Sequence, residues 1–289
     1  MKKVLLQLDT DEHPSPFDAI VAHDADVDVL LSQGGVKPDE VRGLVQDAFF
    51  TRGPDDLKNT AVWVGGKDVA TGEQIFDQVQ KAFFGPFRVS VMLDSNGCNT
   101  TAATTIARIA KAYDLGGKRA VVLGLGAVGL RSATLLQQED CEVTVASLPP
   151  DLFGDDRPYH RPRGLSVAEQ LGLDIREPAD RSELEATLDG AQIVLAAGPA
   201  GIELLRRDAW AGAASVELLA DYNAAEPLGL EDTEATDDLE DYDGKLVLGA
   251  LAIGGPKMKV HKACVRRLFE SNDQVLDTEA VYAVAKELV

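Results

Sequence analysis

Three glycines in the middle of the chain constrain its fold most strongly, because they follow the pattern G-x-G-x-x-G. Gly124, Gly126 and Gly129 lie between the apolar run AVVL and an apolar helical segment that begins with Ala127 and Val128. In this context the first glycine permits a tight turn, the second lets a pyrophosphate approach the backbone, and the third lets helix and strand pack closely. The pattern predicts a dinucleotide-binding turn, with an ordinary Gly-rich turn as the alternative.

The strand after this turn lacks the acidic residue that a site preferring NAD carries about 20 residues after the glycines. Here the segment CEVTVAS ends in Ser147. A ribose phosphate is then tolerated, and we expect Ser147 to hydrogen-bond it and Arg161 to neutralise it. Arg157, His160 and Arg163 lie in the same basic segment. The sequence therefore favours NADP as cofactor, with NAD as the alternative.

Charge and composition exclude several classes of function. A formal net charge of -20 over 289 residues opposes binding to nucleic-acid phosphates. The opening MKKVLLQLDTDEH has too short an apolar run for a signal peptide or a membrane span, so we expect a cytoplasmic protein without a membrane partner. The cysteines Cys98, Cys141 and Cys264 are odd in number and widely spaced, which predicts neither a disulfide framework nor a metal site.

Strands and helices alternate along the chain, which predicts parallel sheets covered by helices. The first series runs from the strand VLLQLDT through a helix over SPFDAIVAHDADVDVLL, capped by Ser15, to the strands NTAVWVGG and FRVSVMLD. The second begins at RAVVLGLG and ends with the strands SVELLADYN and KLVLGALAIGG. We expect an α/β protein of two domains: a smaller parallel-sheet substrate domain at 1–114 and a Rossmann-like domain at 115–260. The helical segment 261–289 is expected to pack back on the first domain.

A polar turn, DSNGCNTT, follows one of the predicted parallel strands, and ligands of such sheets bind at the carboxyl ends of strands. Its side chains with ligand-binding capacity are Asp94, Ser95, Asn96, Asn99 and Thr100. Capping of the helix that follows is the competing explanation, and the two roles are compatible.

Several further segments resemble one family. LDTDEHPSPFD, FFGPFRVSVMLDSNGCNTTAA, AAGPAGIELL, ADYNAAEPLG and GALAIGGPKMKVHKACVRRLFES are similar to segments of the methylene-tetrahydromethanopterin dehydrogenases of methylotrophic bacteria. The resemblance runs nearly end to end and is weakest over SLPPDLFGDDRPYHRPRG. It implies an oxidoreductase of one-carbon metabolism that oxidises the methylene group on a reduced pterin and passes a hydride to a nicotinamide cofactor. It also implies a homo-oligomer, a trimer or hexamer.

For the pterin site, the resemblance strengthens the choice of residues near the two ends of the chain. Asp18, in the first turn of a predicted helix, is expected to bind the amino-pyrimidine edge or to favour the cation that hydride loss creates, and Phe17 to stack on the ring. Lys257 is expected to contact the pterin carbonyl or a ring nitrogen, near a helix start, with His261 on the same helical face.

For the cofactor, the segments AAGPAG and ADYNA each end a predicted strand. Ala197, Gly198 and Pro199 are expected beside the nicotinamide, where small residues leave room for two stacked rings. Asp221 and Asn223 are expected to bind the carboxamide or the pterin, with an ordinary turn as the alternative.

Two other functions compete with this interpretation. One is a methylene-tetrahydrofolate dehydrogenase that also performs the cyclohydrolase step, which needs a lysine placed to handle water. The other is a dinucleotide-binding sensor without catalysis, which leaves DSNGCNTT and GPKMKVH unexplained.

Overall fold

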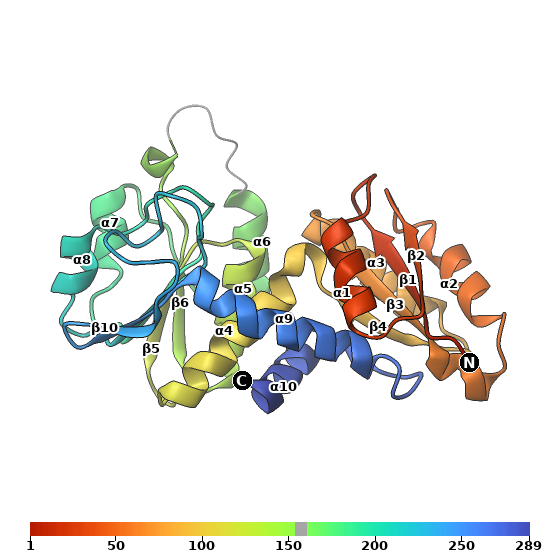
Figure 1. The fold of residues 1–289 in the computed structure, drawn as a ribbon. Coiled ribbons are helices and arrows are strands. Elements are labelled where there is room, and N and C mark those ends of the chain that lie inside the picture. The colour runs from red at the N-terminus through yellow and green to blue at the C-terminus, as the bar shows by residue number, and fades with distance from the viewer. Residues whose placement is uncertain (154–160) are drawn as a thin grey trace. The chain divides into compact units, whose positions relative to one another are not determined.

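The computed structural model describes residues 1–153 and 161–289, without the side chains of residues 161 and 162, and it forms two compact units (Figure 1). Unit 1 comprises Met1–Ala103 and Lys257–Val289, and unit 2 comprises Thr104–Pro256. The divisions fall inside helices α4 (Cys98–Ala112) and α9 (Ala250–Arg267), whereas the sequence predicted them at loop positions after residues 114 and 260. A continuous helix carries the chain from one unit to the next, so no loop marks either boundary.

Unit 1 is built on a parallel sheet with the strand order β2-β1-β3-β4-β12. Leu6 and Leu8 face a core shared with Val62, Val64 and Ile75, while the alternate residues of β1 point to the opposite face. The C-terminal segment adds the last strand to this sheet. The elements are β1 (Val4–Asp9), α1 (Pro16–Asp24), β2 (Val29–Gln33), α2 (Val41–Phe49), η1 (Pro54–Asn59), β3 (Thr60–Gly65), α3 (Val69–Ala82), β4 (Ser90–Leu93), η2 (Ser95–Gly97), β12 (Val275–Leu276) and α10 (Thr278–Leu288).

One expectation for unit 1 was wrong. The helix capped by Ser15 ends at Asp24, and the residues expected to continue it turn back to form β2. Asp26 has a φ of 64°, in the left-handed region, which stops the helix. The apolar residues of the DVDVLL run fit the period of a helix as well as that of a strand, and pairing with β1 decides the outcome.

Unit 2 has the strand order β7-β6-β5-β8-β9-β11-β10, in which all neighbours are parallel except β10 with β11. Without β10 this is the strand order of the doubly wound dinucleotide-binding fold, with its topological switch point between β5 and β8. The predicted Rossmann-like domain is confirmed. The elements are β5 (Arg119–Leu123), α5 (Ala127–Gln138), β6 (Glu142–Ala146), η3 (Pro150–Leu152), α6 (Arg161–Gln170), β7 (Asp174–Arg176), α7 (Arg181–Ala186), β8 (Ile193–Ala196), α8 (Arg207–Gly212), β9 (Leu218–Asp221), β10 (Asp238–Tyr242) and β11 (Lys245–Leu248).

Helix α9 begins earlier than the sequence suggested. The segment expected as one long strand divides into β11, which ends at Leu248, and a helix that starts at Ala250 and contains Pro256. A proline has no N–H, so the carbonyl four residues earlier, that of Ala252, loses its helical partner. The Arg108 guanidinium donates to that oxygen at 2.9 Å and also pairs with Asp238. Lys257 therefore lies in mid-helix and not near a helix start.

Among the described residues, no helix has both the length and the apolar content needed to cross a membrane.

Replacing Arg108 by Ala tests this account of the proline in α9. We expect unit 2 to lose about 1–3 kcal/mol of its free energy of unfolding, because a partly buried carbonyl loses a charged donor. The loss should be smaller in a Pro256→Ala background, where the backbone regains a donor for the Ala252 oxygen. Urea unfolding followed by Trp210 fluorescence measures this loss, in a chain that carries Trp63→Phe so that Trp210 is the only tryptophan. The control is Arg176→Ala, which removes an exposed ion pair. Equal losses in both backgrounds would contradict the account.

Candidate functional site

The polar residues of unit 1 gather where the strand order reverses. Neighbours β1 and β3 form the switch point of this sheet, and Asp9 and Gly65 end these strands. Asp94 follows β4, the next strand along. Ligands of open parallel sheets bind outside the carboxyl ends of strands at such a point. This edge of unit 1 is therefore the candidate substrate site.

Asp18 enters this site from the first turn of α1. The Ser15 hydroxyl caps the helix by accepting a hydrogen bond from the Asp18 N–H at 3.4 Å. The carboxylate Oδ2 accepts from Gln7 Nε2, also at 3.4 Å. Burial raises the pKa of Asp18 to about 7, and the neighbouring carboxyls of Asp94 and Asp9 add to that rise, while Lys257 and the Gln7 hydrogen bond oppose it. Its charge therefore changes near neutral pH.

Asp94, His261 and Lys257 form a chain of contacts from the strand end to helix α9. His261 is 1% exposed, and burial lowers its pKa to about 4, so the imidazole is neutral. Lys257 Nζ lies 3.3 Å from His261 Nδ1, which must act as the acceptor because an ammonium group only donates. The proton of the ring then belongs to Nε2, which lies 3.5 Å from Asp94 Oδ2, too far for a good hydrogen bond.

The two residues predicted on α9, Lys257 and His261, differ in their surroundings. His261 is buried and packs against Trp63, with ring centroids 4.9 Å apart, and its Nδ1 lies beside the Lys257 ammonium group. The Lys257 ammonium lies 5.1 Å from the centroid of the Phe17 ring. Phe17 is 49% exposed, which leaves ring surface for a planar ligand.

The turn after β4 serves structure as well as the site. Asp94 accepts hydrogen bonds from the backbone N–H and the hydroxyl of Thr100, at 3.0 and 2.7 Å, and Asn99 donates to the carbonyl of Leu93. The Ser95 hydroxyl donates to the carbonyl of Gly65 at 3.4 Å. These side chains are buried, whereas Asn96 is exposed and has a φ of 53°. Of the five polar residues predicted in this turn, Asn96 is the one that faces solvent.

Sequence reasoning missed Gln7, Asp9 and Trp63. All three side chains are fully buried, and Gln7 Nε2 donates to Asp9 Oδ2 at 3.3 Å. A polar residue in the otherwise apolar run VLLQL was the available signal, because an amide inside a buried strand needs partners.

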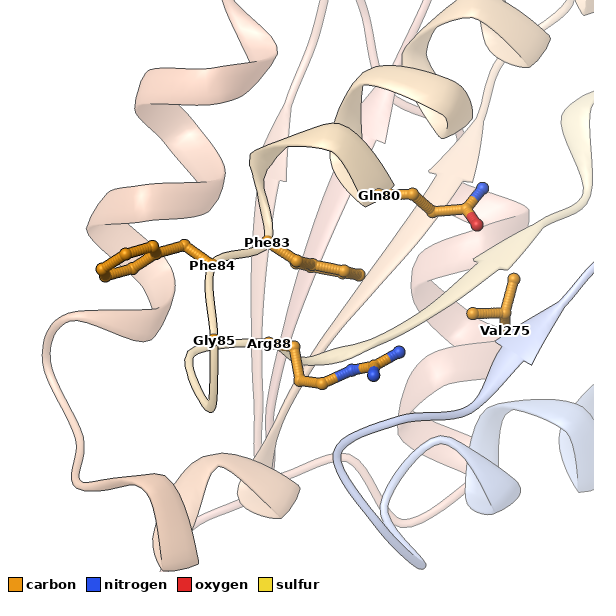
Figure 2. A pocket seen from close by; sticks show the side chains of 6 residues that line it. All are labelled: Gln80, Phe83, Phe84, Gly85, Arg88 and Val275. Atoms are coloured by element: carbon orange, nitrogen blue, oxygen red, sulfur yellow. The ribbon is translucent and has the colours of Figure 1, made fainter.

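A separate hollow of about 290 Å³ lies at the other edge of the same sheet. It is lined by Gln80, Phe83, Phe84, Gly85, Arg88 and Val275, and Figure 2 shows the Phe83 and Phe84 rings pointing to opposite sides of the loop after α3. Arg88 precedes β4, so this hollow lies at the amino end of that strand. It does not share the position at which parallel sheets bind their ligands.

In unit 2, the three glycines each do what the pattern requires. Gly124 has a φ of 117°, and a Cβ there would lie 2.5 Å from the carbonyl oxygen of Ala197. A Cβ on Gly129 would lie 2.4 Å from the Gly124 oxygen. Gly126 differs, because its nearest such neighbour is 4.0 Å away and the residue is exposed at the N-cap of α5. The turn leaves open space where a pyrophosphate would approach, at a helix N-terminus that starts with Ala127 and Val128.

Ser147, after β6, fits the predicted site for a ribose substituent. Its side chain is 1% exposed, and its hydroxyl has no hydrogen-bond partner among the described residues. A buried hydroxyl without a partner is unfavourable, so an external acceptor or donor would stabilise it. Arg157 and His160 and the side chain of Arg161 lie outside the described residues, and Arg163 is exposed.

Of the other residues predicted to bind the cofactor, some are exposed and some contact neighbouring parts of unit 2. Pro199 is exposed, whereas a Cβ on Gly198 would lie within 3 Å of Leu204. Asp221 accepts hydrogen bonds from the N–H groups of Asn223 and Leu230, at 2.8 and 3.1 Å, and burial raises its pKa to about 6. The Asn223 side chain bonds backbone groups of residues 201, 225 and 227. Asp221 and Asn223 therefore hold the loop after β9.

Family models match both parts of the chain. Residues 16–96 match the model described as methylene-tetrahydromethanopterin dehydrogenase, N-terminal, and residues 112–201 match a putative NAD(P)-binding model. These ranges include Asp18 and Asp94 in the first case and all three glycines in the second.

Two curated relatives come from Methylorubrum extorquens. The bifunctional protein MdtA is 44% identical over 290 residues, covering 99% of each chain. The NAD(P)-dependent methylenetetrahydromethanopterin dehydrogenase is 29% identical over 302 residues, again covering 99% of each chain. Among solved structures, shikimate 5-dehydrogenase from Thermus thermophilus in complex with shikimate matches with a TM-score of 0.47 and 16% identity, covering 99% of this chain and 98% of that one.

Replacing Gly126 by Val tests the cofactor turn. We expect dinucleotide affinity to fall at least about tenfold, because the side chain enters the open space, while thermal stability stays near that of the wild type. Isothermal titration calorimetry and thermal unfolding measure the two quantities. Gly129→Val should instead lower stability through its clash with the Gly124 carbonyl, and Gly212→Val, with open space around it, is the control. Undiminished affinity in Gly126→Val would contradict the assignment.

Proposed function

We propose that this chain, which belongs to the family of methylene-tetrahydromethanopterin dehydrogenases, oxidises methylene-tetrahydromethanopterin to its methenyl form with NADP as hydride acceptor, in one-carbon metabolism. The observation that carries the proposal is the 44% identity to a curated relative along 99% of both chains. The chemistry of the residues at the two strand-end sites supports it independently.

The dinucleotide would be held by the turn after β5. Gly124, Gly126 and Gly129 with the N-terminus of α5 suit a pyrophosphate, and Ser147 supplies a buried hydroxyl for the ribose or its phosphate. The absence of a carboxylate at the end of β6 removes a group that would repel a 2′-phosphate, which supports NADP over NAD. When bound, this cofactor supplies the hydride acceptor.

The pterin would lie at the carboxyl ends of β1, β3 and β4. We assign the amino-pyrimidine edge to the Asp18 carboxylate, the ring face to Phe17 and the carbonyl or a ring nitrogen to Lys257. These groups suit the ligand, because a carboxylate accepts two N–H donors, an exposed ring stacks on a flat heterocycle and an ammonium donates to a carbonyl. His261 acts through Lys257, because its Nδ1 accepts from the ammonium group and holds it in place.

The electrostatics of the site suit removal of a hydride. Loss of hydride from a carbon between two nitrogens leaves an amidinium-like cation, so the step needs alignment and a negative environment and no general base. Asp18 faces two other carboxyl groups, those of Asp94 and Asp9, and one ammonium group, that of Lys257, while His261 is neutral. Once the carboxyls are ionised the site carries net negative charge, which stabilises the cation as it forms.

Cellular context forms a separate part of the proposal. We propose a cytoplasmic homo-oligomer, in line with the family. Cys98, Cys141 and Cys264, all among the described residues, are buried and not joined in disulfides, which suits a reducing compartment.

Steady-state reduction of NADP and of NAD, each with methylene-tetrahydromethanopterin and with methylene-tetrahydrofolate, tests the proposal. We expect the methanopterin substrate with NADP to give the highest kcat/KM. If only methylene-tetrahydrofolate is turned over, the folate replaces the methanopterin as the assigned substrate. Dinucleotide binding without turnover of either pterin would favour a sensor.

Replacing Asp18 by Asn tests the pterin assignment. In the wild type the KM for the pterin should fall as the pH rises through about 7, because the carboxyl ionises there and only the ionised form accepts two N–H donors. The variant should lose that dependence, with a KM raised roughly ten- to a hundredfold at high pH, the value of a lost charged hydrogen bond. Asp39→Asn, at an exposed position of unit 1, is the control. A wild-type pH profile in Asp18→Asn would exclude the role.

A further inference from the structure

Gln7 is a buried amide in the middle of a strand where packing alone would favour an apolar residue. Its side chain is fully buried, and β1 has β2 and β3 on its two sides. Its neighbours Leu6 and Leu8 face the apolar core, so Gln7 and Asp9 share the opposite face. Burying a carboxamide costs free energy unless its donors and acceptor are bonded, and here each of them has a partner.

The hydrogen bonds of Gln7 fix which end of the amide faces the site. The Ser32 hydroxyl donates to Gln7 Oε1 at 2.7 Å, which turns the NH2 group toward the carboxylates. Nε2 then donates to Asp9 Oδ2 at 3.3 Å and to Asp18 Oδ2 at 3.4 Å. The reversed amide would place an oxygen against two carboxylate oxygens, so only this orientation is favourable.

The surroundings of Asp18 leave one carboxylate oxygen available. Oδ2 lies against Gln7, and a Cβ on Gly65 would lie 3.1 Å from it, so the glycine makes room for this oxygen. Among the residues that the structure describes, no donor bonds Oδ1. The carboxylate is thus held by one oxygen and can offer the other to a ligand.

We propose that Gln7 is a positioning residue of the substrate site: its amide bridges Asp9 and Asp18 and keeps Asp18 oriented to bind the ligand through its second oxygen. The inference rests on the proposed function for the identity of that ligand, the N–H edge of an amino-pyrimidine. The bridging itself depends only on residues of unit 1.

The bridge also acts on the charge of Asp18. The groups that face Asp18 are Asp9 and Gln7 on β1, Asp94 after β4 and Lys257 on α9. The two carboxyls raise the pKa of Asp18, and Lys257 and the Gln7 amide lower it. Removal of the amide leaves the carboxyls of Asp9 and Asp18 without their shared donor. The pKa of Asp18 then rises, and at neutral pH a smaller fraction is ionised.

A direct titration separates this inference from the proposed function. We would follow the aspartate carboxyl carbons of the full chain, without substrate, by isotope-edited NMR, and identify the Asp18 signal by its loss in Asp18→Asn. In Gln7→Leu the midpoint of Asp18 should move up by about 0.5 to 1 pH unit. Ser32→Ala, which frees the amide to rotate, should move it in the same direction by less. Ser32 is exposed, so that variant keeps the fold even if Gln7→Leu does not.

Kinetics give a second readout that a purely structural role would not produce. The KM for the pterin should rise several-fold in both variants below neutral pH and converge with the wild-type value in alkali, where Asp18 is ionised in every variant, while kcat changes little. An unshifted Asp18 midpoint in both variants, or a wild-type KM in both at every pH, would overturn the role of Gln7. If the Asp18 midpoint shifts in the variants but the wild-type protein turns over neither pterin, the bridge is sustained and the proposed function is refuted.

Discussion

The unit 1 site depends on the contacts among buried charged and polar groups at the carboxyl ends of β1, β3 and β4. Asp9 and Asp94 are drawn together there because parallel strands end at a common edge, and the first turn of α1 adds Asp18. Such carboxyls repel one another, and burial makes each charge more costly. The groups that oppose this effect at Asp18 are the Lys257 ammonium and the Gln7 amide, so this neutral amide affects whether Asp18 carries charge at neutral pH.

This arrangement suits a reaction that creates positive charge and moves no proton. The neutral His261 cannot offset the carboxylates, and its ring nitrogen holds the ammonium of Lys257 next to the exposed face of Phe17. In unit 2, by contrast, the turn after β5 depends on the space around its glycines. Backbone carbonyls occupy the positions where a Cβ of Gly124 or Gly129 would lie, whereas the corresponding position at Gly126 is empty.

Sequence reasoning succeeded where one local requirement determines the outcome. The glycine pattern predicted the turn, because each of its positions has a separate steric need. The same reasoning failed where two structures satisfy one pattern, as in the DVDVLL run, which pairs with β1 instead of extending α1. It also failed at α9, because the helix passes through Gly254, Gly255 and Pro256 with the help of an arginine distant in sequence.

The sequence by itself determined the class of fold, the dinucleotide turn and the family, since periodicity, glycine spacing and end-to-end similarity are all properties of the chain as written. Only the tertiary structure decided which polar residues lie together at one edge of a sheet and which bond to the backbone of a loop. It places Gln7 between two carboxylates, His261 behind Lys257, and Asp221 and Asn223 under a loop. The physical reason is that charge state and hydrogen bonding depend on distances of a few ångströms between segments far apart in the chain, and those distances exist only once the strands are paired.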